Sequence, residues 1–472
     1  MTQFRTLHGS PLNVEESAIE SLRTALGGGL HDPGDAAYDE ACDIWNAMVE
    51  RKPALVARCR SNTDVAAAVD FAAKHKVLLS VRGRGHHIAG NSLADGGLAI
   101  DLSHLRKVTL DEKTGVVTAQ PGASLGDLDA ATAPKGWVVP TGINSTTGVA
   151  GLTLGGGFGW LSRKFGMTVD SLIEAEVVTA DGKTVTASDS KNSDLFWALR
   201  GGGGNFGVVT RFTYQAHRIA PELYSGLIVH PASAADDVLR FYREFSAKAS
   251  DELTIWVVMR KAPPLPFLPE DVHGKEVVVF ALLHCGDPAT AEREVKPLLE
   301  YGKPVGSHLG VQPFAAWQQA FDPLLTPGAR NYWKSHNFAS LSDDLFDVFT
   351  KALGTLPSDF SEIFIFQLGG ATGRVPVDAT AFPHRDTRYG MNVHTRWETA
   401  AEDASCVAWA RKLFADAEPY STGGAYSNFL TDDADDAVAA AYGSNAKRLA
   451  EIKAKYDPNN LFRMNHNVKP KK

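Results

Sequence analysis

The chain has 472 residues, of which 44% are of hydrophobic type and 22% charged, enough to bury a large core and form about two to four domains. Its 47 Lys and Arg against 55 Asp and Glu give a net charge of −8, and the only basic run is the tail at 469–472, so nucleic acid is not an expected partner. Four scattered cysteines without CxxC spacing indicate neither a disulfide framework nor a zinc site. Without a signal peptide or an apolar run of about 18 residues, we expect a cytoplasmic protein with no membrane attachment.

The first half of the chain predicts strands that lead into glycine-rich loops. The first forty residues mix Pro, Gly and acidic residues and are interpreted as a leader lying on the main body. A helix capped by Asn62 or Thr63, and another capped by Ser124 and ended by Gly136, are predicted between strands at 54–58, 77–81, 98–102 and 115–119. The strand at 77–81 runs directly into the loop 82–92.

Further along, Asp181 and Gly182 between Val- and Thr-rich segments predict a hairpin of strands 175–180 and 183–187. A short helix at 194–200 and a strand at 208–214 follow. From about 216 the pattern changes to longer strands and helices, with strands at 253–260, 276–284, 362–368 and 391–397 and helices at 233–248 and 289–300. After 420 the glycine loops return, and a helix at 435–456 ends in a turn at 457–460.

The segment 202–207 satisfies GxGxxG, a pattern found in Rossmann dinucleotide sites. That site requires a strand before the glycines and a helix after them. Here a helix precedes and a strand follows, so we interpret the segment as a helix-to-strand turn.

The loop 82–92 is better placed for binding, because small residues after a strand can turn several N–H groups toward one anion. An ordinary surface turn with solvated arginines remains the alternative. His86, at its tip, is by itself more often a structural histidine. His86 and His87 lack the spacing of helical metal ligands, so no metal is expected.

The run 140–159 contains seven glycines. Glycine there costs conformational entropy, about 0.5–1 kcal/mol per regular-structure position relative to Ala. We therefore expect this backbone to approach something flat and close.

Several segments together are typical of one family. They are 81–86, 148–159, 162–170, 195–210 and 456–463 followed by 465–467. In this order, from about 53 to 470, they closely resemble FAD-linked oxidases of the vanillyl-alcohol oxidase superfamily, in the berberine-bridge-enzyme-like branch. Their joint occurrence makes the resemblance specific.

The resemblance implies an α+β fold with a two-part PCMH-type FAD-binding domain, formed by residues 1–215 and 420–472. A central substrate domain, residues 216–419, would carry a large antiparallel sheet covered by helices. In this family a histidine at the position of His86 bonds the flavin 8α-methyl, for which the imidazole must be neutral. Asn144 stands where doubly linked members have a cysteine, so a single link is predicted. Arg84 replaces the usual first glycine of the motif and could pair with the pyrophosphate or crowd it.

The resemblance also assigns cofactor contacts residue by residue. The loop next to the pyrophosphate would comprise Arg82, Gly83, Arg84, Gly85, His86, His87, Asn91 and Ser92. The ring and ribityl chain would be lined by Thr141, Gly142, Thr147, Gly148, Ala150, Gly151 and Gly157, and the adenine by Val209. The flavin edge would be faced by Asn428, Asn465 and Asn467.

The implied chemistry is hydride transfer from a small alcohol, sugar or amine to the flavin, followed by reoxidation by O2. An alcohol donor requires a base, and Tyr426 is the leading candidate, although it could equally pack on the ring. Gln367, His394 and Arg396, with Tyr389 and Trp333, could face the substrate or could be ordinary sheet packing. The segment 380–385 is interpreted as structural, and 432–436 as an acidic surface run.

Two other functions remain open at this point. The same half-reaction could belong to a dehydrogenase that does not use O2. Alternatively, the protein could bind FAD without turnover.

Overall fold

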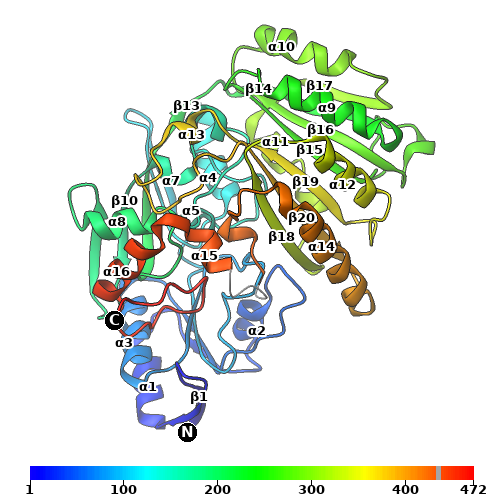
Figure 1. Cartoon of the computed structure of the whole chain (residues 1–472). Helices are drawn as coiled ribbons and strands as arrows, with labels where there is room; N and C mark the ends of the chain where they lie inside the picture. The colour runs from blue at the N-terminus through cyan, green and yellow to red at the C-terminus, as the bar shows by residue number, and fades with distance from the viewer. Residues whose placement is uncertain (432–436) are drawn as a thin grey trace.

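The computed structural model describes residues 1–431 and 437–472, and the strands of these residues form five sheets. The acidic run at 432–436 lies outside the described residues. A seven-stranded antiparallel sheet lies beside smaller sheets built from the first 220 residues, and the C-terminal helices return to pack on the N-terminal half (Figure 1). This arrangement confirms the predicted α+β class.

A four-stranded sheet in the order β3-β4-β6-β5 delivers the loop 82–92. Its strands are β3 (Leu30–His31), β4 (Leu55–Arg58), β5 (Leu79–Arg82) and β6 (Leu98–Asp101), with β4 and β5 parallel to β6. Helix α3 (Asn62–His75) connects β4 to β5. The helix is present, but the predicted cap at Asn62 or Thr63 is wrong: the capping residue is Ser61, whose hydroxyl accepts a hydrogen bond from the Asp64 N–H.

The first forty residues are an integral part of this body, and the interpretation of a leader is wrong. Helix α1 (Glu16–Ala25) packs against α3 and presents Ile19 and Leu22, three residues apart, to the core that holds Leu55. The remaining elements of the segment are β1 (Thr2–Arg5), β2 (Pro11–Val14) and α2 (Ala36–Cys42).

A five-stranded sheet in the order β11-β10-β12-β8-β7 forms the second part of the N-terminal half. Its strands are β7 (Val108–Asp111), β8 (Val116–Ala119), β10 (Leu172–Val178), β11 (Thr184–Ser188) and β12 (Val208–Gln215). Strands β10 and β11 form the predicted hairpin, and Ser124 caps α4 (Leu125–Thr132) with a capping box. The turn 202–207 follows α8 (Ser193–Leu199) and precedes β12, so its order is that of a helix-to-strand turn, as predicted.

Short elements complete this half. They are a two-stranded sheet of β9 (Trp137–Val138) and β13 (His217–Arg218), and the helices α5 (Val149–Leu154), α6 (Ser162–Phe165) and α7 (Thr168–Ser171).

The seven-stranded sheet has the order β17-β14-β16-β15-β19-β20-β18, and every neighbouring pair is antiparallel. Its strands are β14 (Glu222–Pro231), β15 (Leu253–Lys261), β16 (Glu276–His284), β17 (Gly306–Pro313), β18 (Arg330–Phe338), β19 (Glu362–Gln367) and β20 (Tyr389–Trp397). The four strands expected in this region are confirmed to within two residues.

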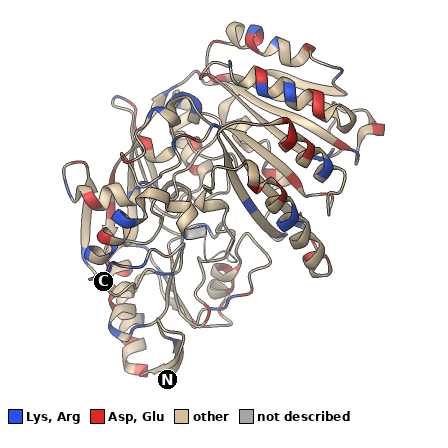
Figure 2. Ribbon diagram, in the orientation of Figure 1, with Lys and Arg blue, Asp and Glu red and all other residues tan. Residues whose placement is uncertain are grey.

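The two faces of this sheet have different partners. One face is covered by α9 (Ala235–Ser246), α10 (Pro288–Glu300), α12 (Asp343–Leu353) and α14 (Asp403–Ala417), and it buries Ile255, Val257 and Met259. The outer surfaces of these helices carry interspersed acidic and basic residues (Figure 2). On the other face, Trp256 packs against Trp160 of the N-terminal half. Two short helices, α11 (Phe314–Gln319) and α13 (Ala371–Arg374), follow β17 and β19.

The C-terminal segment is anchored by a buried ion pair. The helix predicted at 435–456 is divided, in its described part, into α15 (Ala437–Tyr442) and α16 (Ala446–Tyr456). The Lys453 ammonium lies 2.6 Å from an Asp457 carboxylate oxygen and also donates to the carbonyls of Asn205 and Phe462. Asp457 in turn accepts the N–H groups of Leu461 and Phe462. No helix of the described residues is long and apolar enough to cross a membrane.

Candidate functional site

A continuous cavity runs from the end of the four-stranded sheet to the uncovered face of the seven-stranded sheet. Its walls come from regions distant in sequence: the loop after β5, the glycine run around α5, strands of the seven-stranded sheet, and the segment after α16. The sequence-predicted residues that line it are Gly83, Arg84, Gly85, His86, His87, Asn91, Ser92, Gly142, Thr147, Gly148, Ala150, Gly151, Val209, Trp333, His394, Tyr426, Asn428 and Asn465.

The loop after β5 has the properties of an anion nest. The N–H groups of residues 84–88 donate no hydrogen bond to any residue that the structure describes. Gly85 has a φ of +73°, and a Cβ there would lie 3.0 Å from Ile44, so the turn requires glycine. Arg84 lines the cavity beside these N–H groups and forms no ion pair within the described part of the chain. A row of unpaired N–H groups next to a cation suits a pyrophosphate.

A chain of hydrogen bonds fixes which nitrogen of the His86 ring carries the proton. The Thr146 hydroxyl donates to Asn144 Oδ1 at 2.7 Å, so its oxygen accepts from His86 Nε2, 2.9 Å away. The proton therefore resides on Nε2 and the lone pair on Nδ1. Burial and then the charge of Arg84 lower the pKa of His86 to about 3, and Trp45 stacks on the ring with centroids 5.3 Å apart.

His87 has a different environment. Its Nδ1 accepts a hydrogen bond from the Ala89 N–H, and its ring packs 5.4 Å from that of His466. Burial, His466 and Arg51 lower its pKa to about 3. Since Nδ1 accepts this backbone hydrogen bond, the His87 ring does not offer that lone pair to the cavity.

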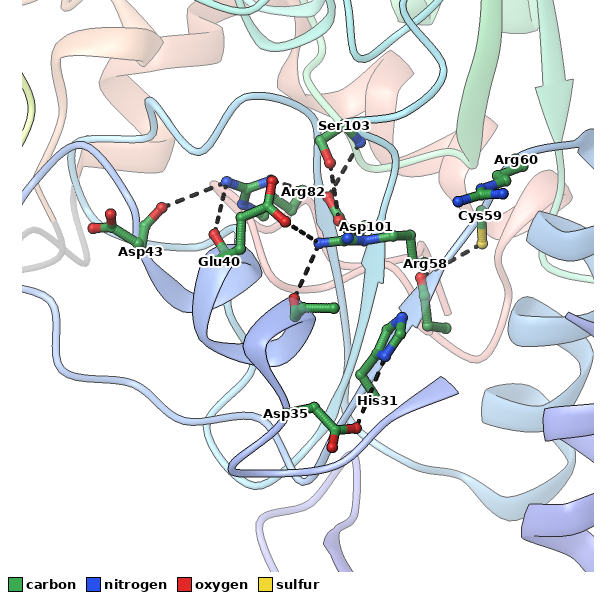
Figure 3. A network of polar contacts seen from close by, with 12 residues as sticks. His31, Asp35, Glu40, Asp43, Arg58, Cys59, Arg60, Arg82, Asp101 and Ser103 are labelled. Carbon is green, nitrogen blue, oxygen red and sulfur yellow. Dashed lines mark hydrogen bonds and ion pairs between the residues drawn. The ribbon is translucent and has the colours of Figure 1, made fainter. Parts of the chain in front are cut away.

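The side chain of Arg82 does not contact the cavity, and the expectation that it binds the cofactor is corrected. Its guanidinium pairs with Asp101 at 3.0 Å and donates to the carbonyls of Glu40 and Asp43, as Figure 3 shows. Asp101 also pairs with Arg58. Arg82 therefore joins neighbouring strands below the loop instead of facing the anion site.

The glycine run forms one wall of the cavity. A Cβ added at Gly151 would meet no atom within 4 Å, whereas one at Gly148 would lie 2.9 Å from the Cβ of Arg84. Thr141 and Gly157, expected at the ring, do not line the cavity. The φ of Gly157 is +73°, and its N–H donates to the Tyr426 hydroxyl, so it acts on the site through that tyrosine.

Tyr426 is fixed at the cavity by two hydrogen-bond donors. Its oxygen accepts from the Gly157 N–H at 3.1 Å and from Asn428 Nδ2 at 2.9 Å. Burial raises the pKa of Tyr426 to about 12, although both donors lower it in part. Asn428 also donates to the carbonyls of Gly151 and Leu152, which ties the tyrosine to the glycine wall.

Several buried polar atoms around the cavity lack partners among the described residues. They include Ser92 Oγ and Asn465 Oδ1, both from residues that line it. Asn91 lines it too and accepts from Arg51. Asn467 Oδ1 is also buried and unpaired, but Asn467 is outside the lining. A nest of N–H groups, a glycine wall and unpaired amide and hydroxyl groups fit a dinucleotide that carries a flat ring.

Strand alternation decides which residues of the large sheet reach the cavity. His394 and Trp333 do, but Gln367 and Tyr389 lie on the helix-covered face, contrary to expectation. The Gln367 side-chain amide accepts a hydrogen bond from the Ile255 N–H and donates one to the Ser246 carbonyl, which gives it a structural role. Arg396 is on the cavity side but is also corrected, because its guanidinium bonds Thr326 at the sheet end and does not line the cavity.

Sequence reasoning missed a polar cluster next to His394. Glu362 lines the cavity, lies 3.0 Å from His394 Nδ1, and pairs with Arg260 at 2.8 Å. Burial by itself would raise the pKa of Glu362, but Arg260 and His394 outweigh it and leave this pKa below its usual value. The signal was present, since Glu362 is the single charged residue of the apolar strand 362–367.

Comparison with known proteins agrees with this geometry. The family described as FAD binding domain matches residues 53–188, and the family described as berberine and berberine like matches residues 425–469. An uncharacterised FAD-linked oxidoreductase of Bacillus subtilis, YvdP, is 31% identical over 95% of this chain and 99% of its own.

Solved structures have the same fold. The crystal structure of 6-hydroxy-D-nicotine oxidase from Arthrobacter nicotinovorans is similar with a TM-score of 0.84 and 27% identity, covering 94% of this chain and 98% of its own. A chitooligosaccharide oxidase has a TM-score of 0.84 and 26% identity, covering 96% of this chain and 100% of its own. The chain therefore belongs to the berberine-bridge-enzyme-like, PCMH-type family of FAD-linked oxidoreductases.

Proposed function

We propose that this protein is an oxidase that takes a hydride from a small alcohol, sugar or amine and passes the electrons to O2 through a covalently bound FAD. The observation that carries this proposal is the single cavity in which the anion nest, the glycine wall and the polar cluster of the large sheet meet. Support for the donor and acceptor classes comes from the similar proteins, which are named as oxidases of a hydroxynicotine and of a chitooligosaccharide.

Cofactor binding and donor binding would be the tasks of two different regions of the chain. Residues 1–215 and 420–472 would hold the cofactor, and residues 216–419 would cover the ring and bind the donor. In this arrangement the N–H groups of residues 84–88 and Arg84 bind the pyrophosphate, Val209 lies on the adenine side, and residues 142–151 line the ring and ribityl chain. Bound flavin supplies the hydride acceptor and its reoxidation.

His86 would carry the single link to the flavin. A lone pair is needed at the attacking nitrogen, and the chain from Asn144 through Thr146 leaves that lone pair on Nδ1. The lowered pKa of about 3 keeps the ring neutral at physiological pH. With an asparagine at position 144, the chain has no thiol there for a second link.

Tyr426 would act as a hydrogen-bond donor at the reacting end of the cavity. Its oxygen already accepts two hydrogen bonds, and a pKa of about 12 keeps its own proton in place near neutrality. This supports a positioning role for Tyr426, in which its hydroxyl orients the donor or the ring, over the role of base.

The first test is whether the colour is covalent. Purified holoenzyme is precipitated with acid, and the yellow colour should stay with the polypeptide. Colour that is entirely in the supernatant would remove the link at His86 while leaving the FAD site intact.

The second test identifies the donor class. Under anaerobic conditions, a panel of alcohols, sugars and amines is scored by loss of flavin absorbance, and air is then admitted. Reduction by a donor and rapid reoxidation by O2 are expected. Reduction with slow reoxidation would indicate a dehydrogenase, and a flavin that no donor reduces would indicate a non-catalytic binding protein.

A further inference from the structure

Three polar side chains from adjacent strands meet on the cavity face of the large sheet. Glu362 of β19 lies between Arg260 of β15 and His394 of β20, and it contacts each through a different oxygen. Arg260 is 8% and His394 5% exposed, and the Glu362 side chain is 13% exposed. Such a buried charged cluster is costly unless its members are paired, and here the carboxylate is paired on both sides.

The hydrogen bonds fix which nitrogen of His394 is free. Arg260 holds Glu362 as a carboxylate, which can only accept hydrogen bonds, so His394 Nδ1 must donate. When the ring is neutral, its lone pair is therefore on Nε2. This atom is buried and has no hydrogen-bond partner among the described residues, a state that is uncommon in folded proteins.

His394 also lies close to the residues proposed to flank the ring. Its ring packs edge-on against Trp333 with centroids 4.8 Å apart. Trp333 in turn packs against Trp45, which stacks on His86. On its other side Trp333 packs against Phe429, which contacts Tyr426 at 4.9 Å. Two aromatic residues thus lie between His394 and the predicted tether, and two lie between His394 and the tyrosine.

The wall around this cluster is apolar. Residues of the same cavity include Leu325, Phe364, Val258 and Val279, contributed by the sheet and by the segment before β18. The other polar side chain of β20 in the cavity, Asn392, is uncharged and cannot serve as a base near neutrality. This environment suits a donor with an apolar body and one hydroxyl.

We propose that His394, held by Glu362, accepts the hydroxyl proton of an alcohol donor with an apolar body. The inference rests on the proposed function, which supplies the oxidant. In the step, the donor O–H bond breaks and its proton passes to His394 Nε2. The adjacent C–H hydrogen leaves with its electron pair to the flavin, and the C–O bond becomes a carbonyl. The resulting imidazolium faces the Glu362 carboxylate, which compensates its charge.

The first experiment reads the proton directly and needs no turnover. The probe is 4-nitrophenol, an apolar body with one hydroxyl whose ionised form absorbs at longer wavelength. It is titrated into holoenzyme at a pH below its own pKa. Bound probe should shift toward the ionised band in the parent protein, and His394→Asn should reduce this shift at least tenfold. No shift in the parent, or an equal shift in His394→Asn, would overturn the proposal.

A matched control is available on the same sheet. His308 of β17 is exposed and stacks on Phe267, outside the cavity lining. His308→Asn makes the same chemical change and should leave the spectral shift unaltered. Retention of flavin absorbance in every variant shows that the fold and the cofactor site are intact.

The second experiment compares benzyl alcohol with benzylamine, whose neutral form needs no base. His394→Asn should slow flavin reduction by the alcohol about 100-fold or more, as expected for loss of a general base, and by the amine only a few-fold. Glu362→Gln should have an intermediate effect on the alcohol, because the imidazolium loses its counter-charge. Equal slowing of both donors would indicate a structural role and overturn the proposal.

These outcomes separate the two claims. Failure of every alcohol and amine to reduce the parent flavin would count against the proposed function. The 4-nitrophenol titration would still report on His394. Conversely, a parent enzyme that oxidises the alcohol while His394→Asn matches it would refute the role of His394 and leave the proposed function standing.

Discussion

Thr146→Val tests how the chain prepares His86 for attachment. The substitution keeps the shape of the side chain but removes the oxygen that accepts from His86 Nε2 at 2.9 Å. Valine cannot accept a hydrogen bond, so the buried N–H loses its partner and the lone pair is no longer directed to Nδ1. A buried group left unpaired costs about 1–3 kcal/mol. At about 1.4 kcal/mol per factor of ten, attachment of flavin should be roughly 5- to 150-fold slower.

The assay follows the covalent product with time. Protein prepared without flavin is mixed with FAD, samples are quenched in acid, and colour retained in the pellet is measured. Thr146→Ser, which restores the hydroxyl, is the matched control and should attach flavin at a rate close to that of the parent. A Thr146→Val protein that attaches flavin as fast as the parent would refute the hydrogen-bond chain. Equal losses in the Ser and Val variants would refute it as well, since they would point to shape instead of hydrogen bonding.

Three other changes have expected outcomes. The His86→Ala protein should bind FAD that is released on acid denaturation, whereas the His87→Ala protein should keep its yellow colour after acid precipitation. Release of FAD from both variants would argue against a covalent link specific to His86. Tyr426→Phe removes a hydrogen-bond donor and should slow flavin reduction by alcohols and amines alike. The slowing should be about 10- to 100-fold if the bond is worth about 1.4–2.8 kcal/mol, within the usual range for a buried bond. Selective loss of the alcohol reaction would instead assign Tyr426 the role of base. Burial raises the pKa of Asp129 to about 7 despite its hydrogen bond from Gln318. The folded state therefore holds this proton more tightly than the unfolded state, so the folding stability that the protonated carboxyl provides is complete below about pH 4 and is lost as pH rises through about 7. Asp129→Asn should therefore raise Tm at pH 8, by an amount corresponding to at most about 4 kcal/mol, and by less than half that amount at pH 5. An equal change at both pH values would contradict this reasoning.

Local signals in the sequence were sufficient to predict most elements and to place the glycine loops. Turn residues such as Asp181 and Gly182, and the Ser124 cap, act within a few residues of themselves, so the hairpin and helix they predict are present. The glycine loops could be placed for the same reason, because what precedes and follows them in sequence determines what they can do.

The direction of side chains in the large sheet could not be predicted. The strand 362–367 is apolar on both faces, since Ile363 and Ile365 contact the helices while Phe364 and Phe366 face the cavity side. Because alternate residues of such a strand do not differ in polarity, the sequence did not indicate that Gln367 faces the helices. Residues such as Trp45 and Thr146 reach the site from loops, and loops have no periodic pattern from which their positions could be predicted.

The buried pair of Lys453 and Asp457 has a consequence for the order of events during synthesis. Residues 461–466 close one side of the cavity, and their position depends on an ammonium group that bonds the carbonyl of Asn205, about 250 residues earlier. A growing chain therefore has no complete compartment until residues 461–466 have left the ribosome. Enclosure of the flavin must follow the synthesis of these residues, and a chain that stops at residue 452 should be colourless even though it contains the loop 82–92 and the glycine run.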